Sequence, residues 1–275
     1  PARNVYGLRN SVFFSVSLPI ISRFCAVVAR GVRPKAFFRK PCFQSHLDPR
    51  GNDASGIRPD SIAILSKNVS GHSRQLDDLA LRGDAMKDEQ SFIPKEGGNH
   101  YAADLVSQIH QLNQGNYLHG VTDIDHKSDF CIGVAGYPEK HLESPSLISD
   151  LKRLKEKVDA GADYVVTQMF FDNAKFFEFV AKAREIGINV PIIPGIKPIA
   201  VHRHLQILPQ IFRIDLPEDL INAVEKCKTP ADIRQVGVEW AIQQSLELKA
   251  AGVPFLHYYS MGKSENIRQI ANKVF

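Results

Sequence analysis

The sequence predicts an α/β fold of the (β/α)8 TIM-barrel type, with the last five β/α units recognisable and the first three missing or aberrant. From about residue 79 onward, apolar runs of strand length alternate with segments whose apolar residues recur at helical spacing, which is typical of βαβ units and a parallel sheet. No G-x-G-x-x-G motif follows any run, so the usual signature of an open, dinucleotide-binding sheet is absent. Polar and aromatic residues stand instead where the runs end, as they do in barrel enzymes. An open doubly wound sheet stays the alternative.

Five strand-like runs carry this prediction. Four of them are followed by a turn residue or a charged residue, and most are rich in Val, Ile, Tyr and Phe, as buried parallel strands are. In chain order they are Leu79–Leu81, Phe130–Tyr137, Tyr164–Phe171, Val190–Ile196 and Val253–Ser260.

A helical segment is expected after each run. Ser146 is a good capping residue for the second of them, and Gly161 and Gly187 are placed to end the second and third. In the longer helical stretch that follows, Pro217 and Pro230 suit first helical positions. The apolar faces are expected to be Tyr101, Ala102, Leu105, Val106, Ile109 and Leu112; Ile148, Leu151, Leu154 and Val158; Phe176, Phe177, Val180 and Ala183; and Ile267, Ile270 and Val274.

The charge distribution divides the chain into two zones. Residues 1–75 hold 12 Lys and Arg against three Asp and no Glu, a balance of +9, and the first glutamate of the chain is Glu89. The remaining residues hold 22 Lys and Arg against 27 Asp and Glu, a balance of −5. We therefore expect residues 1–77 to be a basic segment that is disordered, a targeting sequence or frame-shifted, and residues 78–275 to be the barrel portion.

Composition excludes several classes of protein. None of the four cysteines forms a C-x-x-C pair, so reduced thiols and a cytoplasmic location are expected. The longest apolar stretch, Ser11–Ile21, contains Pro19 and is shorter than the roughly 20 residues that a membrane span needs. No metal site is expected. Nucleic-acid binding is not expected either, because the basic excess lies in residues 1–75.

The tripeptide Arg82-Gly83-Asp84 directly follows the first strand-like run of the barrel portion. Taken by itself, it fits an exposed adhesion loop, a plain surface turn or the mouth of an active site. Reduced cysteines weaken the first of these readings, because adhesion loops lie outside the cell. Its place behind a strand favours the last.

The chain from about Leu79 to Phe275 resembles the methylenetetrahydrofolate reductase family. The resemblance lies in five tracts, of which the third is the most specific: LALRGD (79–84), EGGNHYAADLV (96–106), GVAGYPEKHLESPSLISDLKRLKEKVDAGADYVVTQMFFDN (133–173), VPIIPGIKPI (190–199) and LHYYSMGKS (256–264). It implies a barrel that binds FAD at the carboxyl ends of its strands and reduces methylenetetrahydrofolate to methyltetrahydrofolate with NADH or NADPH, in one-carbon metabolism and methionine supply. A homo-oligomer is also expected.

The resemblance also implies the site residues. Arg82, Gly83 and Asp84 would line the FAD site, and Asp84 would tune the flavin, face the folate and act as a catalytic residue. Gln168, with Asp84 and Lys263, would bind substrate. The other residues implied to contact FAD are Tyr101, Ala102, Tyr137, His141, Glu143, Asp150 and Lys157.

One feature of the family is missing from the sequence. The family carries a glutamate on its first strand, in a Phe-Glu-Phe-Phe-Pro-Pro-like motif, as the general acid for the folate. Nothing before Glu89 can be that residue. The alternative function is therefore a catalytically impaired or inactive barrel fragment that at most binds flavin.

Overall fold

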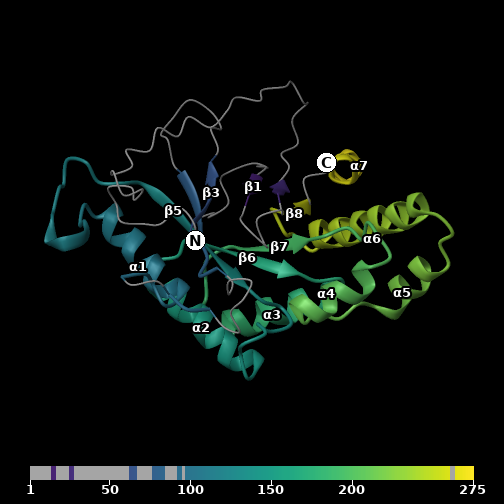
Figure 1. Cartoon of the computed structure of the whole chain (residues 1–275), viewed down its shortest axis with the longest axis horizontal. Helices are drawn as coiled ribbons and strands as arrows, with labels where there is room; N and C mark the ends of the chain where they lie inside the picture. Colours follow the sequence, from purple (N-terminus) through teal and green to yellow (C-terminus); the bar gives the residue numbers. More distant parts are fainter. Residues whose placement is uncertain are drawn as a thin grey trace, which may run out of the picture.

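A computed structural model gives the fold of the chain (Figure 1). It describes residues 14–16, 25–27, 62–66, 76–83, 92–94, 97–260 and 264–275. For residues 14–16, 25–27, 62–66 and 76–78 only the backbone is described, and the side chain of residue 119 is left out. Asp84 and Lys263, two of the predicted site residues, lie outside the described residues.

The strands form one sheet of eight in the order β1-β2-β8-β7-β6-β5-β4-β3. The five from β4 to β8 pair in parallel and are β4 (Leu76–Ala80), β5 (Phe130–Gly136), β6 (Tyr164–Met169), β7 (Ile192–Ile196) and β8 (His257–Ser260). This confirms the prediction of five β/α units of a partial barrel.

The strands that precede β4 depart from a barrel. They are β1 (Phe14–Val16), β2 (Cys25–Val27) and β3 (Ile62–Ser66), and each pairs antiparallel with its neighbours. β1 and β3, at the two ends of the hydrogen-bonded order, nevertheless contact each other, so the sheet curls toward closure. In the described part of residues 1–75 this agrees with the prediction that the first units are aberrant, because a (β/α)8 barrel is parallel throughout.

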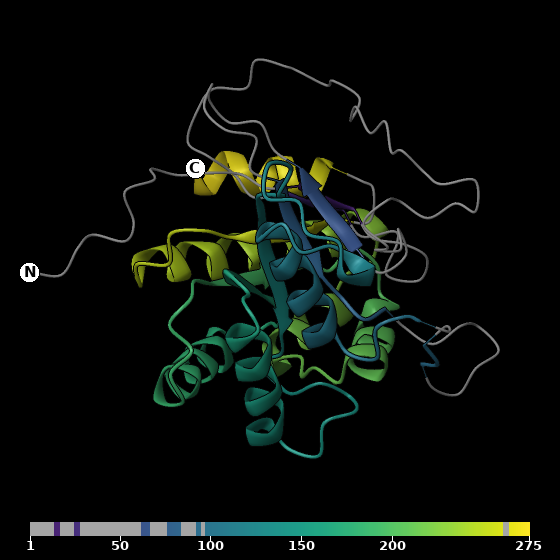
Figure 2. The ribbon, with the colours of Figure 1, turned by 90° about the vertical axis from the view of Figure 1, so that its left-hand side faces the viewer.

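The helices lie around the outside of the curled sheet (Figures 1 and 2). They are α1 (Ala102–Asn113), α2 (Leu147–Asp159), α3 (Asn173–Glu185), α4 (His204–Phe212), α5 (Glu218–Glu225), α6 (Pro230–Ala250) and α7 (Glu265–Val274). Their ends follow local chemistry. The Ser146 hydroxyl accepts a hydrogen bond from the Ser149 N–H at 3.1 Å to begin α2, and Gly161 and Gly187 follow α2 and α3 with φ of +117° and +80°. Within the described residues, none of these helices has both the length and the apolar character to span a bilayer.

Alternation along the strands separates two apolar layers. Between the sheet and the helices lies the main core, to which Ile132, Val134 and Val165 contribute. On the opposite face, a smaller cluster fills the inside of the curl with Leu79, Tyr164, Val166 and Ile193. In a third cluster, apolar side chains of α4, α5 and α6 pack with Met169 and Phe171.

Four details of the sequence prediction were wrong. Tyr101, expected on the apolar face of the first helix, is 64% exposed. Ile148 is 67% exposed and Phe177 is 40% exposed, so neither belongs to the buried face of its helix. Pro217 is the N-cap residue of α5 rather than its first helical residue, whereas Pro230 does begin α6. In α2 and α3 the buried apolar face is narrower than the residue spacing suggested, because only part of it meets the sheet.

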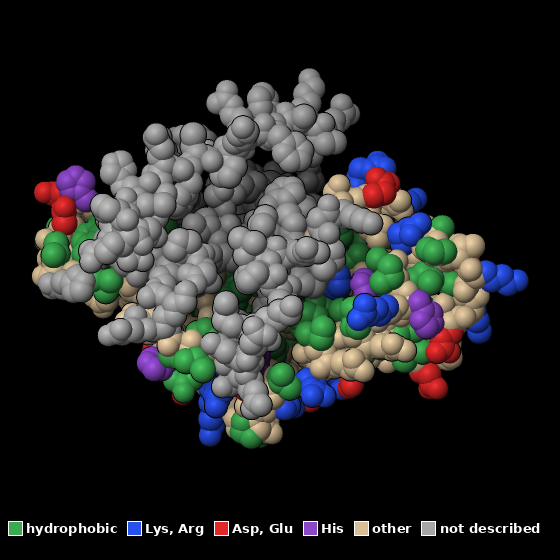
Figure 3. Space-filling model, viewed as in Figure 1, with side chains coloured by type: hydrophobic (Ala, Val, Ile, Leu, Met, Phe, Trp, Pro, Cys, Tyr) green, Lys and Arg blue, Asp and Glu red, His purple; other side chains and the backbone are tan. Residues whose placement is uncertain are grey.

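The outer surface of the helices is mixed in charge. On the face drawn in Figure 3, basic and acidic side chains of the described residues are interspersed. Several form pairs one helical turn apart, such as Lys182 with Glu178 at 2.5 Å. Exposed pairs of this kind stabilise a helix by about 0.3–0.5 kcal/mol each, so they add modestly to the stability of the helices.

Candidate functional site

Arg82 links the end of β4 to the segment that follows β5. Its Nη1 and Nη2 donate to Oε2 and Oε1 of Glu143, both at 2.7 Å. The guanidinium carbon also lies 5.0 Å from the centre of the Phe92 ring. The hydrogen bonds from Arg82 hold the pKa of Glu143 below its ordinary value. Two predicted FAD contacts, 61 residues apart in sequence, therefore form one bidentate pair.

Asp150, in the first turn of α2, folds the β5–α2 loop back onto the helix. Its Oδ2 accepts the His141 backbone N–H at 3.0 Å, and its Oδ1 accepts the Ser144 hydroxyl at 2.8 Å. Lys140 has a positive φ of 93° and donates from Nζ to the Ser144 carbonyl at 2.7 Å. The loop is thus fixed from within by one carboxylate and one ammonium.

The loop in turn orients two predicted site side chains. The rings of Tyr137 and His141 pack edge to face, with their centres 4.6 Å apart. The Glu143 N–H donates to His141 Nδ1 at 3.1 Å, which leaves the proton of the neutral ring on Nε2. Burial lowers the pKa of His141, so at neutral pH this ring is uncharged and offers one donor.

Lys157 lies two helical turns after Asp150 on the same face of α2, as the spacing predicted. Its Nζ donates to the Ala135 carbonyl at 2.5 Å. Burial lowers the pKa of Lys157 to about 8, against the opposing effect of the Asp150 charge. The ammonium is therefore still protonated at neutral pH.

The structure brings six of the predicted residues together at the carboxyl edge of β4 and β5: Arg82, Tyr137, His141, Glu143, Asp150 and Lys157. Tyr101 is the N-cap of α1 and is 64% exposed, with its N–H on Asp104 at 2.8 Å, and Ala102 is the first residue of that helix. Gln168 is half-buried near the end of β6, where its Oε1 accepts the Met169 N–H at 3.0 Å. The roles of all these residues stay predictions.

Glu139 is a titratable group in this loop that the sequence did not single out. Its Oε2 accepts the backbone N–H of Asp215 at 2.5 Å, and its Oε1 is buried without a hydrogen-bond partner in the part of the chain that is described. Burial raises the pKa of Glu139 to about 7. In the sequence, Glu139 is marked only by its place two residues after the strand-end Tyr137. Its burial was not predictable, because it depends on a residue 76 positions away.

Polar side chains of β8 also meet one another and the backbone of β6. The Tyr259 hydroxyl donates to the Thr167 carbonyl at 2.9 Å, and the ring of Tyr259 meets that of His257 edge to face at 4.6 Å. Burial, with a smaller effect of the nearby Tyr137, raises the pKa of Tyr259. Burial lowers the pKa of His257 to about 3. Both groups are thus neutral across the physiological range.

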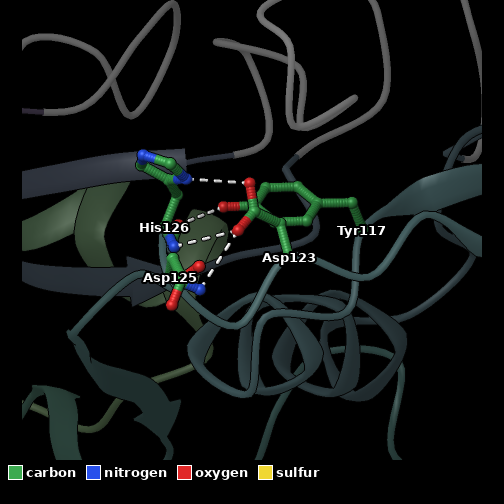
Figure 4. Close-up of polar contacts among 4 residues, drawn as sticks. All are labelled: Tyr117, Asp123, Asp125 and His126. Carbon is green, nitrogen blue, oxygen red and sulfur yellow. Dashed lines mark hydrogen bonds and ion pairs between the residues drawn. The ribbon is translucent and has the colours of Figure 1, made fainter.

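A separate polar cluster in the loop before β5 is structural. Asp123 accepts from the backbone N–H groups of Asp125 and His126 and from His126 Nδ1, at 3.1, 3.2 and 2.9 Å, and the Tyr117 hydroxyl donates to the His126 carbonyl (Figure 4). Asp125 thus contributes its backbone. No group of three His, Cys, Asp or Glu side chains that could hold a metal occurs among the described residues. The loop leads into the amino end of β5, the edge opposite the site.

The fold defines a partial β/α-barrel protein, in which predicted site residues lie together at the carboxyl edge of β4 and β5. The family model of methylenetetrahydrofolate reductase matches residues 74–274, and the chain belongs to that family. This confirms the resemblance seen in the sequence.

Individual relatives agree with the family model. The chain is 35% identical over 197 residues to methylenetetrahydrofolate reductase 1 of Schizosaccharomyces pombe, covering 71% of this chain and 30% of that protein. It is 38% identical over 193 residues to methylenetetrahydrofolate reductase (NADH) 1 of Arabidopsis thaliana, covering 66% and 30%. It is also 33% identical over 190 residues to 5,10-methylenetetrahydrofolate reductase of Pectobacterium carotovorum, covering 68% and 56%. The match thus spans about a third of the eukaryotic relatives and just over half of the bacterial one.

Proposed function

We propose that this chain forms the flavin-binding part of an enzyme that reduces 5,10-methylenetetrahydrofolate to 5-methyltetrahydrofolate with FAD and NADH or NADPH. The observation that carries the proposal is the cluster of Arg82, Glu143, His141, Asp150 and Lys157 at one edge of a parallel sheet, in a chain that belongs to this family. The relatives differ in donor, since the Arabidopsis protein is named for NADH and one from Caenorhabditis elegans for NADPH.

The donor set fits a flavin dinucleotide. Arg82 and Lys157 supply two cations for an anionic diphosphate, and Tyr137 and His141 supply neutral hydrogen-bonding groups. Gly83 has φ +87°, and no heavy atom of the described residues lies within 4 Å of where its Cβ would be. A ligand can therefore approach the backbone closely there. When bound, FAD would accept hydride from the nicotinamide and deliver it to the folate.

The substrate contacts are proposed from the same edge. Gln168 carries both a donor and an acceptor, which suits a pterin edge or a nicotinamide carboxamide. We propose Asp84 as the catalytic residue beside the flavin and Lys263 as a cation for the folate glutamate tail. For these chain residues the role is binding and orientation, and for Asp84 also an electrostatic influence on the flavin.

One alternative is favoured by specific observations. The sequence has no glutamate before Glu89, and β1, β2 and β3 pair antiparallel where a barrel would have its first parallel units. Residues 1–88 thus hold no counterpart of the glutamate that the family carries on its first strand. On this second proposal the protein binds flavin but does not reduce methylenetetrahydrofolate.

The visible spectrum of the purified full chain separates these proposals. We would record it with FAD and then after adding NADH or NADPH without oxygen. In a parallel sample we would also add methylenetetrahydrofolate and measure methyltetrahydrofolate. Bleaching of the flavin band with product supports the first proposal, and bleaching without product supports the second. A colourless chain that takes up no FAD contradicts both.

Matched variants locate the flavin in that experiment. Arg82→Met should weaken FAD binding, because it removes a cation from the cluster. The control is Arg268→Met, which removes an equally paired arginine, bonded to Glu265 at 3.0 and 2.8 Å on α7. If both variants bind FAD as the parent does, the cluster is not the flavin site.

A further inference from the structure

Strand β6 carries one extra residue against β7, close to its carboxyl end. Val166 pairs with Ile193 and Met169 pairs with Gly195, so three steps along β6 match two steps along β7. The β7 residue at this bulge is Pro194, which has no N–H to donate to a neighbouring strand. Prolines inside a sheet are largely confined to edges and bulges for that reason. Bulges redirect the side chains that they contain, and they are common beside active sites.

The bulge contains Gln168. This residue is half-buried, whereas the other residues of β6 are buried. Its Oε1 accepts the Met169 N–H at 3.0 Å, which fixes the direction of the side-chain amide. The Nε2 group, with two donor hydrogens, forms no hydrogen bond with any described residue. The bulge therefore presents two amide donors, rather than the amide oxygen, to a ligand.

Tyr259 of β8 fixes the peptide bond that leads into Gln168. Its hydroxyl donates to the Thr167 carbonyl of β6 at 2.9 Å, although β7 lies between these two strands. The tyrosine ring passes over β7 at Gly195. A Cβ on that glycine would lie 2.7 Å from Tyr259 Cε2 and 2.2 Å from the Thr167 carbonyl oxygen. The missing side chain of Gly195 is therefore what allows the tyrosine to reach β6.

The bulge is held at a second point as well. The Thr167 hydroxyl accepts the Gly195 N–H at 2.9 Å. The Tyr259 ring packs edge to face on His257, with the ring centres 4.6 Å apart. Burial raises the pKa of Tyr259, so its hydroxyl stays protonated and is a donor at physiological pH. Residues of β6, β7 and β8 thus form one hydrogen-bonded unit, and Gln168 follows directly on it.

We propose that Tyr259 is a positioning residue, whose hydroxyl holds the bulge of β6 in the form that directs the amide donors of Gln168 at the ligand. The ligand itself, a folate or a nicotinamide, rests on the proposed function. Tyr259 acts through the carbonyl of the peptide that precedes Gln168 rather than by touching the ligand. The rival explanation is a hydroxyl that only satisfies a buried carbonyl and has no effect on Gln168.

Amide exchange of the full chain without substrate tests the positioning directly. The Met169 N–H is bonded to the Gln168 side chain, so its exchange with solvent, followed by NMR, reports whether that side chain stays in place. Tyr259→Phe should speed this exchange by at least about fivefold, because the peptide loses an anchor. The matched control is Tyr258→Phe on the same strand, which removes a buried hydroxyl bonded to Ser245 at 2.8 Å. In that control Met169 exchange should stay within about twofold of the parent.

A double-mutant cycle on binding tests the consequence for the ligand. Calorimetry gives the Kd of NAD⁺ and of tetrahydrofolate, which do not turn over, for the parent with FAD, Tyr259→Phe, Gln168→Met and the double variant. Tyr259→Phe should raise the Kd of the ligand that uses Gln168 by roughly fivefold, the effect of one hydrogen bond. With methionine already at position 168, the same change should stay under about twofold.

Three results would overturn the proposal. They are unchanged Met169 exchange in a folded Tyr259→Phe chain, an equal rise in Kd with glutamine or methionine at position 168, and unchanged Kd values in Gln168→Met. If Tyr259→Phe does not fold, the parent decides: a slowly exchanging Tyr259 hydroxyl proton supports the anchor, and one that exchanges too fast to be observed overturns it. A parent chain that binds neither probe contradicts the proposed function, and Met169 exchange still decides the positioning.

Discussion

Glu139→Gln should remove a pH dependence of stability that originates in the β5–α2 loop. The folded-state pKa of Glu139 is raised by burial from 4.5 to about 7. Below about pH 4.5 the carboxyl is protonated in both folded and unfolded chains, and its burial has no ionic cost. As pH rises to about 7 the unfolded chain ionises first, so stability is lost over that window and stays lower above it.

The size of the effect follows from the shift in pKa. For a fully buried carboxyl, about 2.5 pKa units at 1.36 kcal/mol each would correspond to about 3 kcal/mol. Glu139 is only partly buried, so solvent screening reduces the expected loss to roughly 1 kcal/mol between pH 5 and pH 8. Glutamine keeps a carbonyl oxygen for the Asp215 N–H and has no charge to bury. Any cost of its amide hydrogens is the same at every pH.

Urea unfolding of the full chain, followed by circular dichroism at several pH values from about 5 to 8, measures this effect. The parent should lose roughly 1 kcal/mol more than Glu139→Gln across that range. Glu185→Gln, at an exposed position of α3, should track the parent within about 0.5 kcal/mol. Parallel curves for the parent and Glu139→Gln would refute the reasoning, because the carboxylate would then be well solvated in the folded chain.

Three further predictions concern the loop and the core. A double-mutant cycle of Arg82→Met with Glu143→Gln should give a coupling of about 1 kcal/mol in urea unfolding, because the pair is bidentate but partly exposed; a value near zero would mean that the pair is not formed in solution. Asp150→Asn should leave one of its two loop donors without an acceptor and cost about 1–2 kcal/mol, with faster proteolysis of the loop as the second readout. Gly237→Ala gains about 1 kcal/mol of helix propensity but should destabilise the chain by roughly 1–3 kcal/mol through overpacking, because a Cβ there would collide with the backbone of Ile199. Its control, Ala181→Gly at an exposed position of α3, should cost about 1 kcal/mol from propensity alone, and a stabilised Gly237→Ala chain would contradict the close packing.

Local chemistry made much of the fold predictable. Ser146 begins α2 by accepting a backbone N–H, and Gly161 ends it in a left-handed conformation, both as expected from residue type. β5 begins at the predicted residue Phe130 and ends one residue early, at Gly136. These features depend on residues within a few positions of one another, so the sequence contains them.

Features that depend on distant partners were not predictable in the same way. β4 begins at Leu76, three residues before the apolar run that predicted it, and so includes two aspartates. The strand is longer than predicted because it pairs with β3 and β5. Phe177 looked like a core residue but is 40% exposed, because only one side of α3 meets the sheet.

By itself, the sequence determined the alternation of strands and helices, the family and the residue types at the strand ends. Only the tertiary structure decided which of those residues meet. Arg82 donates hydrogen bonds to Glu143, 61 positions away in sequence, and the backbone N–H of Asp215 donates to Glu139, 76 positions away. The physical reason is that charge pairing and desolvation depend on separation in space, which parallel strands set by bringing their carboxyl ends to one edge.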